Sequence, residues 1–283
     1  MFQMRHYTED ELQSDIEALE FEIITEKGAD RLAQKAHFMD FFEHQIEAWK
    51  SLKATEQQRY LRQCSNNGIK FETFSDFYNR IARDFKTKKY TNFNLLMAHD
   101  LLKRYNPKIV IDPCIGWGHR MLLAGTRQMT YYGSDIRKET VENNEKLAEK
   151  AKIDGHTYLY QSDGAEFINL LPDLDFSQSL LFTCPPYYDS EIYSEEGVEN
   201  LTYDEFLQWW KSIAQNAINK GIPTFAFQIT PKYGDDMVKV VESTGYKYKK
   251  SIRNTRKHQY STHINTQGIE SERLYGKVYV FEK

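Results

Sequence analysis

The stretch KIVIDPCIGWGHR, residues 108–120, decides the fold, because a short β-branched run passes into a glycine-containing turn and then into a helical pattern. Four more β-rich runs follow, and each precedes a helical stretch. We expect helices from about Arg120 and over Lys138–Lys152, Ala165–Leu171, Tyr203–Lys220 and Asp235–Thr244. Strands that alternate with helices predict an α/β fold with a mostly parallel sheet and helices on both faces.

The end of the chain breaks this alternation. YKYKKSIRNTR (246–256) and ERLYGKVYVFEK (272–283) are strand-like runs with no helical pattern between them. We expect them to pair antiparallel through a long loop at Lys257–Glu272. A loop of that length is uncommon unless it has a function or is mobile.

Residues 1–88 differ from the rest because their apolar residues recur at helical spacing. The recurring positions are Leu12, Ile16, Leu19 and Ile23, then Phe38, Phe41, Phe42, Ile46 and Trp49. We therefore expect an N-terminal helical extension over 1–88 and an α/β domain over 89–283.

Composition is that of an ordinary globular protein of 283 residues, with 40% hydrophobic residues and a mean hydropathy of −0.68. No run approaches the roughly 20 apolar residues that a membrane span needs. The first fifteen residues, MFQMRHYTEDELQSD, lack the apolar core and cleavage site of a signal peptide. Cys64, Cys114 and Cys184 are widely spaced, so neither a zinc site nor a disulfide framework is indicated. These features predict a soluble cytoplasmic protein without membrane attachment.

The charge is unevenly distributed around a net value of −4. Residues 9–26 are acidic, whereas 80–89 and 247–257 are basic. Most affinity for DNA comes from cations near phosphates, so a phosphate-binding track would require both basic runs to lie on one face. The acidic N-terminal helices are the expected surface for a protein partner, and the oligomeric state stays open.

Polar groups follow three consecutive predicted strands. Asp112 ends the first, and Gly116 and Gly118 in the following turn allow a backbone to approach a ligand closely. Asp135 ends the second, 19 positions after Gly116, where a βαβ unit places the carboxylate that binds a ribose diol. Asp163 follows the third and would accept from an adenine amino group. Capping of the next helix is the alternative for both Asp135 and Asp163.

The fourth strand ends in TCPPYYD, residues 183–189, where two prolines terminate the strand and leave their carbonyls free. Together, DPCIGWG, GSDI, SDG and TCPPY resemble the Rossmann-like S-adenosylmethionine (SAM)-dependent methyltransferases. Within these they resemble the amino-methyltransferases with an [Asn/Asp/Ser]-Pro-Pro-[Tyr/Phe] motif, and small DNA methylase-like proteins of phages and bacteria above all. The resemblance covers about Tyr90–Lys283.

This resemblance implies SAM as cofactor, DNA as the partner, and methylation of adenine N6 or cytosine N4, with no metal. It implies a catalytic motif of Cys184, Pro185, Pro186 and Tyr187. The cofactor-binding residues that it implies are Asn92, Phe93, Asp112, Cys114, Gly116, Gly118, Asp135, Ile136, Asp163 and Gly164.

The first motif position departs from the family, because Cys184 replaces Asp, Asn or Ser. A thiol is a weak acceptor. Backbone carbonyls would then suffice, or Thr183 would assist, or the chemistry would differ. Cys184 would then be a nucleophile on a ring carbon or, as the more common case, a thiol that only packs. Other hypotheses are methylation of RNA, a nucleotide or a protein amide, and a SAM-binding but catalytically degenerate partner subunit.

Overall fold

The structure, a computed structural model, describes residues 4–20, 26–87, 93, 95–188, 197–253 and 277–283. It divides into two compact units. Unit 1 comprises Met1–Phe93 with Trp117–His119, and unit 2 comprises Asn94–Gly116 with Arg120–Lys283.

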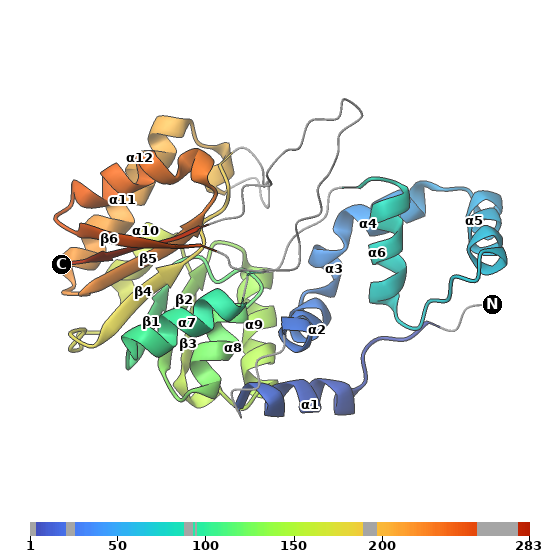
Figure 1. Cartoon of the computed structure of the whole chain (residues 1–283), viewed down its shortest axis with the longest axis horizontal. Helices are drawn as coiled ribbons and strands as arrows, with labels where there is room; N and C mark the ends of the chain where they lie inside the picture. The colour runs from blue at the N-terminus through green and yellow to red at the C-terminus, as the bar shows by residue number, and fades with distance from the viewer. Residues whose placement is uncertain (1–3, 21–25, 88–92, 94, 189–196, 254–276) are drawn as a thin grey trace. The chain divides into compact units, whose positions relative to one another are not determined.

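Unit 2 contains, within the described residues, a seven-stranded sheet of order β3-β2-β1-β4-β5-β7-β6 (Figure 1). The strands are β1 Ile109–Asp112, β2 Thr130–Asp135, β3 Thr157–Gln161, β4 Ser179–Thr183, β5 Thr224–Ile229, β6 Lys247–Arg253 and β7 Lys277–Glu282. The first five pair parallel, and β7 pairs antiparallel with both β5 and β6. The predicted fold class is confirmed, including the antiparallel pairing of the two terminal runs. The predicted loop between them falls outside the described residues.

Helices cover both faces of this sheet, as expected (Figure 1). One face carries α10 Gly164–Leu170, α11 Tyr203–Asn219 and α12 Pro231–Glu242, and the other carries α7 Leu95–Tyr105, α8 His119–Thr126 and α9 Lys138–Lys150. The short 3-10 helices are η1 Asp154–His156 and η2 Val198–Asn200.

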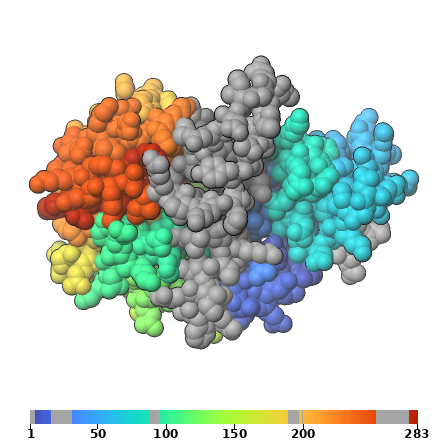
Figure 2. Space-filling view, viewed as in Figure 1, coloured from blue at the N-terminus to red at the C-terminus, as the bar shows by residue number. Residues whose placement is uncertain are grey.

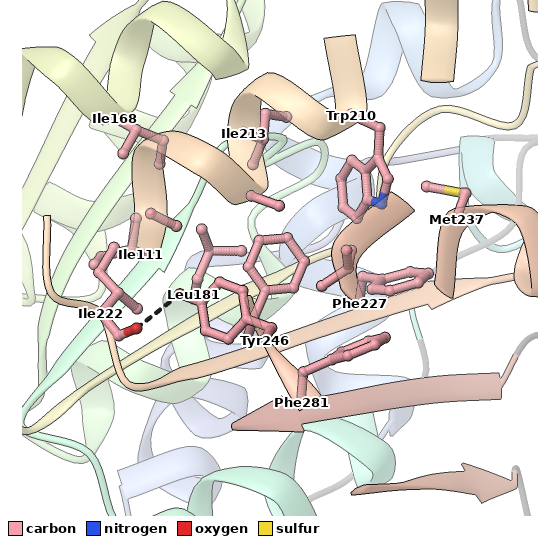
Figure 3. Close-up of a cluster of buried hydrophobic side chains, with 14 of the residues drawn as sticks. Ile111, Ile168, Leu181, Trp210, Ile213, Ile222, Phe227, Met237, Tyr246 and Phe281 are labelled. Atoms are coloured by element: carbon pink, nitrogen blue, oxygen red, sulfur yellow. Dashed lines mark hydrogen bonds between the residues drawn. The ribbon is translucent and has the colours of Figure 1, made fainter. Parts of the chain in front are cut away.

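The face beneath α10, α11 and α12 is an aromatic-rich core (Figure 3). Trp210 and Phe227, both completely buried, meet edge to face with ring centroids 5.0 Å apart. Tyr246 also belongs to this core. Its hydroxyl donates a hydrogen bond to the Ile222 carbonyl over 2.7 Å. Alternate strand residues, such as Val110 and Ala226, are completely buried on the opposite face.

The helices of unit 2 differ from the sequence-based expectation most clearly at α12 and α7. The helix expected over Asp235–Thr244 begins at Pro231, because Thr230 is extended and proline is well suited to the first helical position. Helix α7 was not predicted, although Leu95, Ala98 and Leu102 are buried at helical spacing.

Unit 1 is helical in its described residues, apart from one isolated bridge between Arg5 and Thr73. Its helices are α1 Glu9–Glu20, α2 Glu26–Ala36, α3 Phe38–Phe41, α4 Glu43–Ser51, α5 Ala54–Asn66 and α6 Phe74–Asp84. Thr73 and Asp76 form a capping box at the start of α6. Part of the acidic N-terminal run is internal, because Asp15 is buried and accepts from Arg31 Nε over 2.8 Å. That carboxylate is thus a structural partner and not part of a solvated surface.

The second basic run lies partly on β6, at the edge of the sheet. In Figure 2 the orange and red surface of the C-terminal strands adjoins the green surface of α7. Lys250 Nζ lies 5.5 Å from the centroid of the Tyr105 ring, and Lys249 pairs with Glu282 over 3.3 Å. Lysines on an edge strand also oppose pairing of that strand with another chain. This effect explains the basic residues of β6 without a bound nucleic acid.

No described helix combines the length and the apolar character that crossing a membrane requires.

Gly133 in β2 is a point where the turn after β1 lies against the sheet. A Cβ at this position would overlap the Ile115 side chain and lie 2.7 Å from Tyr131 Cε1. We expect Gly133→Ala to lower the free energy of unfolding by about 1–3 kcal/mol through overpacking, measured by urea denaturation.

Gly155→Ala is the matched control, since a Cβ there meets nothing within 4 Å. It should leave the stability unchanged or raise it by about 0.4–1 kcal/mol. Equal losses for both variants would contradict the close approach of the turn to Gly133.

Candidate cofactor and substrate site

The candidate site follows from the sheet order, because β1 and β4 are neighbours and the strand order reverses between them. Ligands of open α/β sheets bind at the carboxyl ends of the strands beside such a switch point. The ends of β1, β2 and β4, and the residues after β3, carry the groups singled out from the sequence.

Asp112, at the end of β1, is completely buried and surrounded by donors. Arg120 Nε donates to its Oδ2 over 2.6 Å, and Arg120 Nη2 donates to Oδ1 over 3.3 Å. Tyr131 Oη donates to Oδ2 over 2.6 Å, and the Cys114 N–H donates to Oδ1 over 3.2 Å. Both carboxylate oxygens are therefore engaged by the protein, and the expected contact of Asp112 with a cofactor stays a prediction.

The charges of this network reinforce one another. Burial opposes the charged form of Arg120, but the negative charge of Asp112 and the electrostatic interaction with Cys184 raise its pKa above the usual value. Burial and the Asp112 charge both raise the pKa of the Cys114 thiol well above its usual value. Cys114 is thus a neutral thiol at physiological pH and not a thiolate nucleophile.

The turn after β1 is held from two sides. Gly116 and Gly118 have φ values of 52° and 78°, which side chains rarely adopt. Asn144 of α9, completely buried, donates from Nδ2 to the Gly116 carbonyl over 2.8 Å. The Ile115 N–H donates to the Ser134 carbonyl over 3.0 Å, which ties the turn to the end of β2. The backbone of the glycine turn is therefore fixed before any ligand binds.

Asp135, at the end of β2, has a different environment from Asp112. It is partly exposed, and its Oδ1 accepts from the Arg137 N–H over 3.1 Å. Burial raises its pKa to about 6, although hydrogen bonds from the N–H groups of Arg137 and Gly116 act in the opposite direction. The charge of Arg137 also lowers the pKa of Asp135. A partly exposed carboxylate suits the two hydroxyl protons of a ribose. Ile136, the next residue, is also partly exposed.

Asp163 is the N-cap of α10, as one interpretation of the sequence expected. Its Oδ1 accepts from the Ala165 N–H over 2.8 Å, and its Oδ2 accepts from Trp209 Nε1 over 2.7 Å. Gly164 permits a close approach, because a Cβ there would lie 2.9 Å from the Pro113 carbonyl oxygen. The capping role of Asp163 is therefore observed, and its contact with an adenine stays a prediction.

The CPPY segment follows β4 directly. Cys184, Pro186 and Tyr187 are partly exposed, whereas Pro185 is buried. Tyr187 also packs against the aromatic core, and it is the motif residue that offers a ring at this corner. The next residue, Tyr188, packs against the same core, and its ring contacts those of Tyr203, Phe206 and Tyr233.

Unit 2 thus brings together, around the strand ends, most of the residues predicted for the site. They are Asp112, Cys114, Gly116, Asp135, Ile136, Asp163, Gly164, Cys184, Pro185, Pro186 and Tyr187. Phe93 and Gly118 are assigned to unit 1, and Asn92 lies outside the described residues. Among the described residues, no cluster of three or more His, Cys, Asp or Glu could hold a metal ion.

Sequence reasoning missed four side chains of this site: Arg120, Tyr131, Asn144 and Trp209. Arg120 carried a signal, since a cation in the first turn of a helix opposes the helix dipole and needs a specific anion. The others carried none, because their partners are distant in the sequence.

Comparisons with known proteins address the fold. No protein-family model and no curated protein matches the chain. Among solved structures, TrmN from Thermus thermophilus aligns with a TM-score of 0.46 at 15% identity, covering 68% of this chain and 49% of TrmN. The chain therefore spans about half the length of that relative.

Two further structures give similar values. Magnesium protoporphyrin IX methyltransferase (ChlM) from Synechocystis, solved with bound SAM, has a TM-score of 0.45 at 12% identity over 69% of this chain and 86% of ChlM. A putative rRNA methylase from Clostridium thermocellum has a TM-score of 0.47 at 13% identity over 69% of this chain and all of that chain. These identities and TM-scores are too low to decide the activity or substrate of this chain.

The Asp112–Arg120 pair predicts a large and specific loss of stability. Arg120→Met leaves a completely buried carboxylate without its cation, so we expect the free energy of unfolding to fall by about 3–5 kcal/mol in urea denaturation. The control is Lys138→Met, because Lys138 is 68% exposed and pairs with Glu142 over 3.1 Å at the surface. That variant should lose no more than about 0.5 kcal/mol.

The double variant Arg120→Met, Asp112→Leu separates the unpaired charge from the lost packing. It should be more stable than Arg120→Met alone, because no uncompensated carboxylate remains. A double variant as unstable as the sum of both single losses would contradict this explanation.

Proposed function

We propose that this protein is a SAM-dependent methyltransferase that methylates an exocyclic amino nitrogen of a DNA base, adenine N6 or cytosine N4. The observation that carries the proposal is the arrangement at the switch point. The accessible carboxylate of Asp135 and the proline-rich corner at Cys184–Tyr187 lie at strand ends of one sheet, on the two sides of the fixed glycine turn.

The residues at the ends of β1 and β2 fit a nucleoside-bearing cofactor. Asp135 would accept from the ribose hydroxyls, and the rigid turn at Gly116 would let the cofactor approach the backbone closely. Asp112 would act indirectly, because its bonds to Arg120 and Tyr131 hold the strand end in place. Bound SAM would supply an electrophilic methyl group.

The corner after β4 fits the target amine. An exocyclic amine is a poor nucleophile, since its lone pair is delocalised into the ring, and acceptors that bind its hydrogens oppose that delocalisation. The Pro185 carbonyl is one such acceptor in the resembled family. Tyr187 would stack on a base that is flipped out of its helix. Fixed geometry between amine and methyl group would supply much of the rate.

A direct assay of transfer tests the proposal. Purified protein is incubated with methyl-labelled SAM and duplex DNA, single-stranded DNA or tRNA, and the digested nucleosides are identified by mass spectrometry. N6-methyladenine or N4-methylcytosine from DNA supports the proposal. Label found only in tRNA would move the substrate to RNA, and unlabelled nucleic acids despite tight SAM binding would reject the function.

Two substitutions should separate the two halves of the site. We expect Tyr187→Ala to reduce methyl transfer at least tenfold while the dissociation constant for SAM, measured by calorimetry, changes less than about threefold. Asp135→Ala should first weaken SAM, by roughly tenfold or more, through the loss of charge-assisted hydrogen bonds. Equal effects of both variants on SAM affinity would contradict the division.

The raised pKa of Asp135 predicts a pH-dependent affinity for SAM. The carboxylate accepts hydrogen bonds only while ionised, so the affinity should fall as the pH drops through about 6 and level off above pH 7. Without ligand the sign for folding is opposite. The folded state holds this proton more tightly than the unfolded state, so this group costs stability as the pH rises from about 4 to 6.

Calorimetry between pH 5 and 8 measures the binding effect, with Asp135→Asn as the control that lacks the titrating group. A wild-type profile with the same pH dependence as Asp135→Asn would show that Asp135 does not contact the ligand.

A further inference from the structure

Among the described residues, several buried polar atoms near the carboxyl end of β5 have no hydrogen-bond partner. They are Gln228 Oε1, Thr230 Oγ1 and, in the adjoining core, Trp210 Nε1; Figure 3 shows Trp210 in that core. Most buried polar atoms in proteins are paired, so each exception calls for an explanation such as a water molecule or a ligand. They are not equivalent, because Trp210 belongs to the aromatic core and Gln228 does not.

The unpaired atom of Gln228 is Oε1, a hydrogen-bond acceptor, and its side chain lies on the face of β5 away from the aromatic core. Its neighbours Phe227 and Ile229 both point into the aromatic core beneath α11 and α12. Successive side chains of a strand alternate, so Gln228 shares the opposite face with Ala226. That face carries α8, whose Arg120 pairs with Asp112.

The sheet register brings Gln228 close to Cys184. Strands β4 and β5 pair in parallel, with Phe182 opposite Ala226 and Thr183 opposite Phe227. Cys184 and Gln228 each follow this last pair by one residue. By the alternation of β4, Cys184 follows Thr183 on the side of Phe182, opposite to Leu181 of the aromatic core.

Thr183, the residue before Cys184, lies on the other face of β4. It alternates with Phe182 and shares a face with Leu181, which belongs to the aromatic core. Its completely buried side chain interacts with the Cys114 thiol and lowers the pKa of that thiol. The assistance expected of Thr183 from the sequence stays a prediction.

We propose that Gln228 binds the target amino group through its side-chain carbonyl and thereby replaces the acceptor that Cys184 cannot provide. This inference rests on the proposed function. The resembled motif places Asn, Asp or Ser at the Cys184 position, and the carboxamide of Gln228 is the same chemical group as that of Asn. Gln228 carries this amide on the neighbouring strand, one residue after the last pair of the β4–β5 register. With the Pro185 carbonyl it completes the two acceptors that an amino group with two hydrogens needs.

Binding selectivity tests this role without requiring turnover. The protein is saturated with S-adenosylhomocysteine, and calorimetry compares adenosine with purine riboside and cytidine with 2-pyrimidinone riboside. The second member of each pair lacks only the amino group. We expect the wild-type protein to favour one amino-bearing nucleoside by about tenfold, as one lost hydrogen bond to a buried polar group implies. Gln228→Met should abolish that preference and leave the affinity for the ring without an amino group unchanged.

Gln208→Met is the matched control, because Gln208 is exposed on α11. It should retain the preference, and thermal unfolding of both variants verifies that they fold. The decisive complement is Cys184→Asn, which returns an amide to the motif. In that background Gln228→Met should cost less than about threefold in selectivity.

The outcomes separate the two proposals. A preference for the amino group that survives Gln228→Met, or no preference in the wild-type protein, overturns the role of Gln228. A preference that depends on Gln228, in a protein that methylates no nucleic acid, upholds the binding role and rejects only the proposed function. DNA methylation that is unaffected by Gln228→Met, together with unaltered selectivity, upholds the function and rejects only this inference.

Discussion

The buried ion pair between Asp112 and Arg120 is the interaction on which the rest of the site depends. It closes the carboxyl end of β1 at the point where the strand order reverses, and it ties α8 to the sheet. A carboxylate and a guanidinium removed from water are tolerated only when good geometry and further donors satisfy them, and here Tyr131 and the Cys114 N–H complete the set. The glycine turn that follows therefore starts from a rigid anchor, and Asn144 fixes it again at Gly116.

Chemically similar carboxylates serve different purposes at neighbouring strand ends because their partners differ. Asp112 is completely buried and pairs with Arg120, Asp163 caps a helix and accepts from Trp209, and Asp135 accepts from the Arg137 N–H. Burial raises the pKa of Asp135 to about 6. The three expected ligand-binding carboxylates thus differ in their protein partners, and their contacts with a ligand stay predictions.

The sequence predicted the sheet, its antiparallel end and the positions of the strand ends, because those follow from local periodicity and from where prolines and glycines interrupt it. It did not predict the partner of each strand-end residue. Trp209 lies 46 positions from Asp163, and no local pattern indicates that its indole donates there. Arg120 was closer to prediction, since a cation at the start of a helix needs an anion nearby. Helix α7 was not predicted, although Leu95, Ala98 and Leu102 recur at helical spacing.

A cysteine in the first motif position removes a strong hydrogen-bond acceptor from the motif. The parallel pairing of β4 with β5 allows the neighbouring strand to supply an acceptor instead. In a parallel sheet, adjacent strands present matching positions to the same ligand, so an acceptor can be supplied by either strand as long as it stays on the same face. β4 and β5 fit this condition, since Cys184 and Gln228 each follow the last pair of their register by one residue, and the buried Gln228 Oε1 has no hydrogen-bond partner among the described residues. The departure at Cys184 therefore does not remove the groups proposed for binding the cofactor, because the fixed turn and the partly exposed Asp135 are present. The proposed replacement for the missing acceptor is the amide of Gln228 on the neighbouring strand.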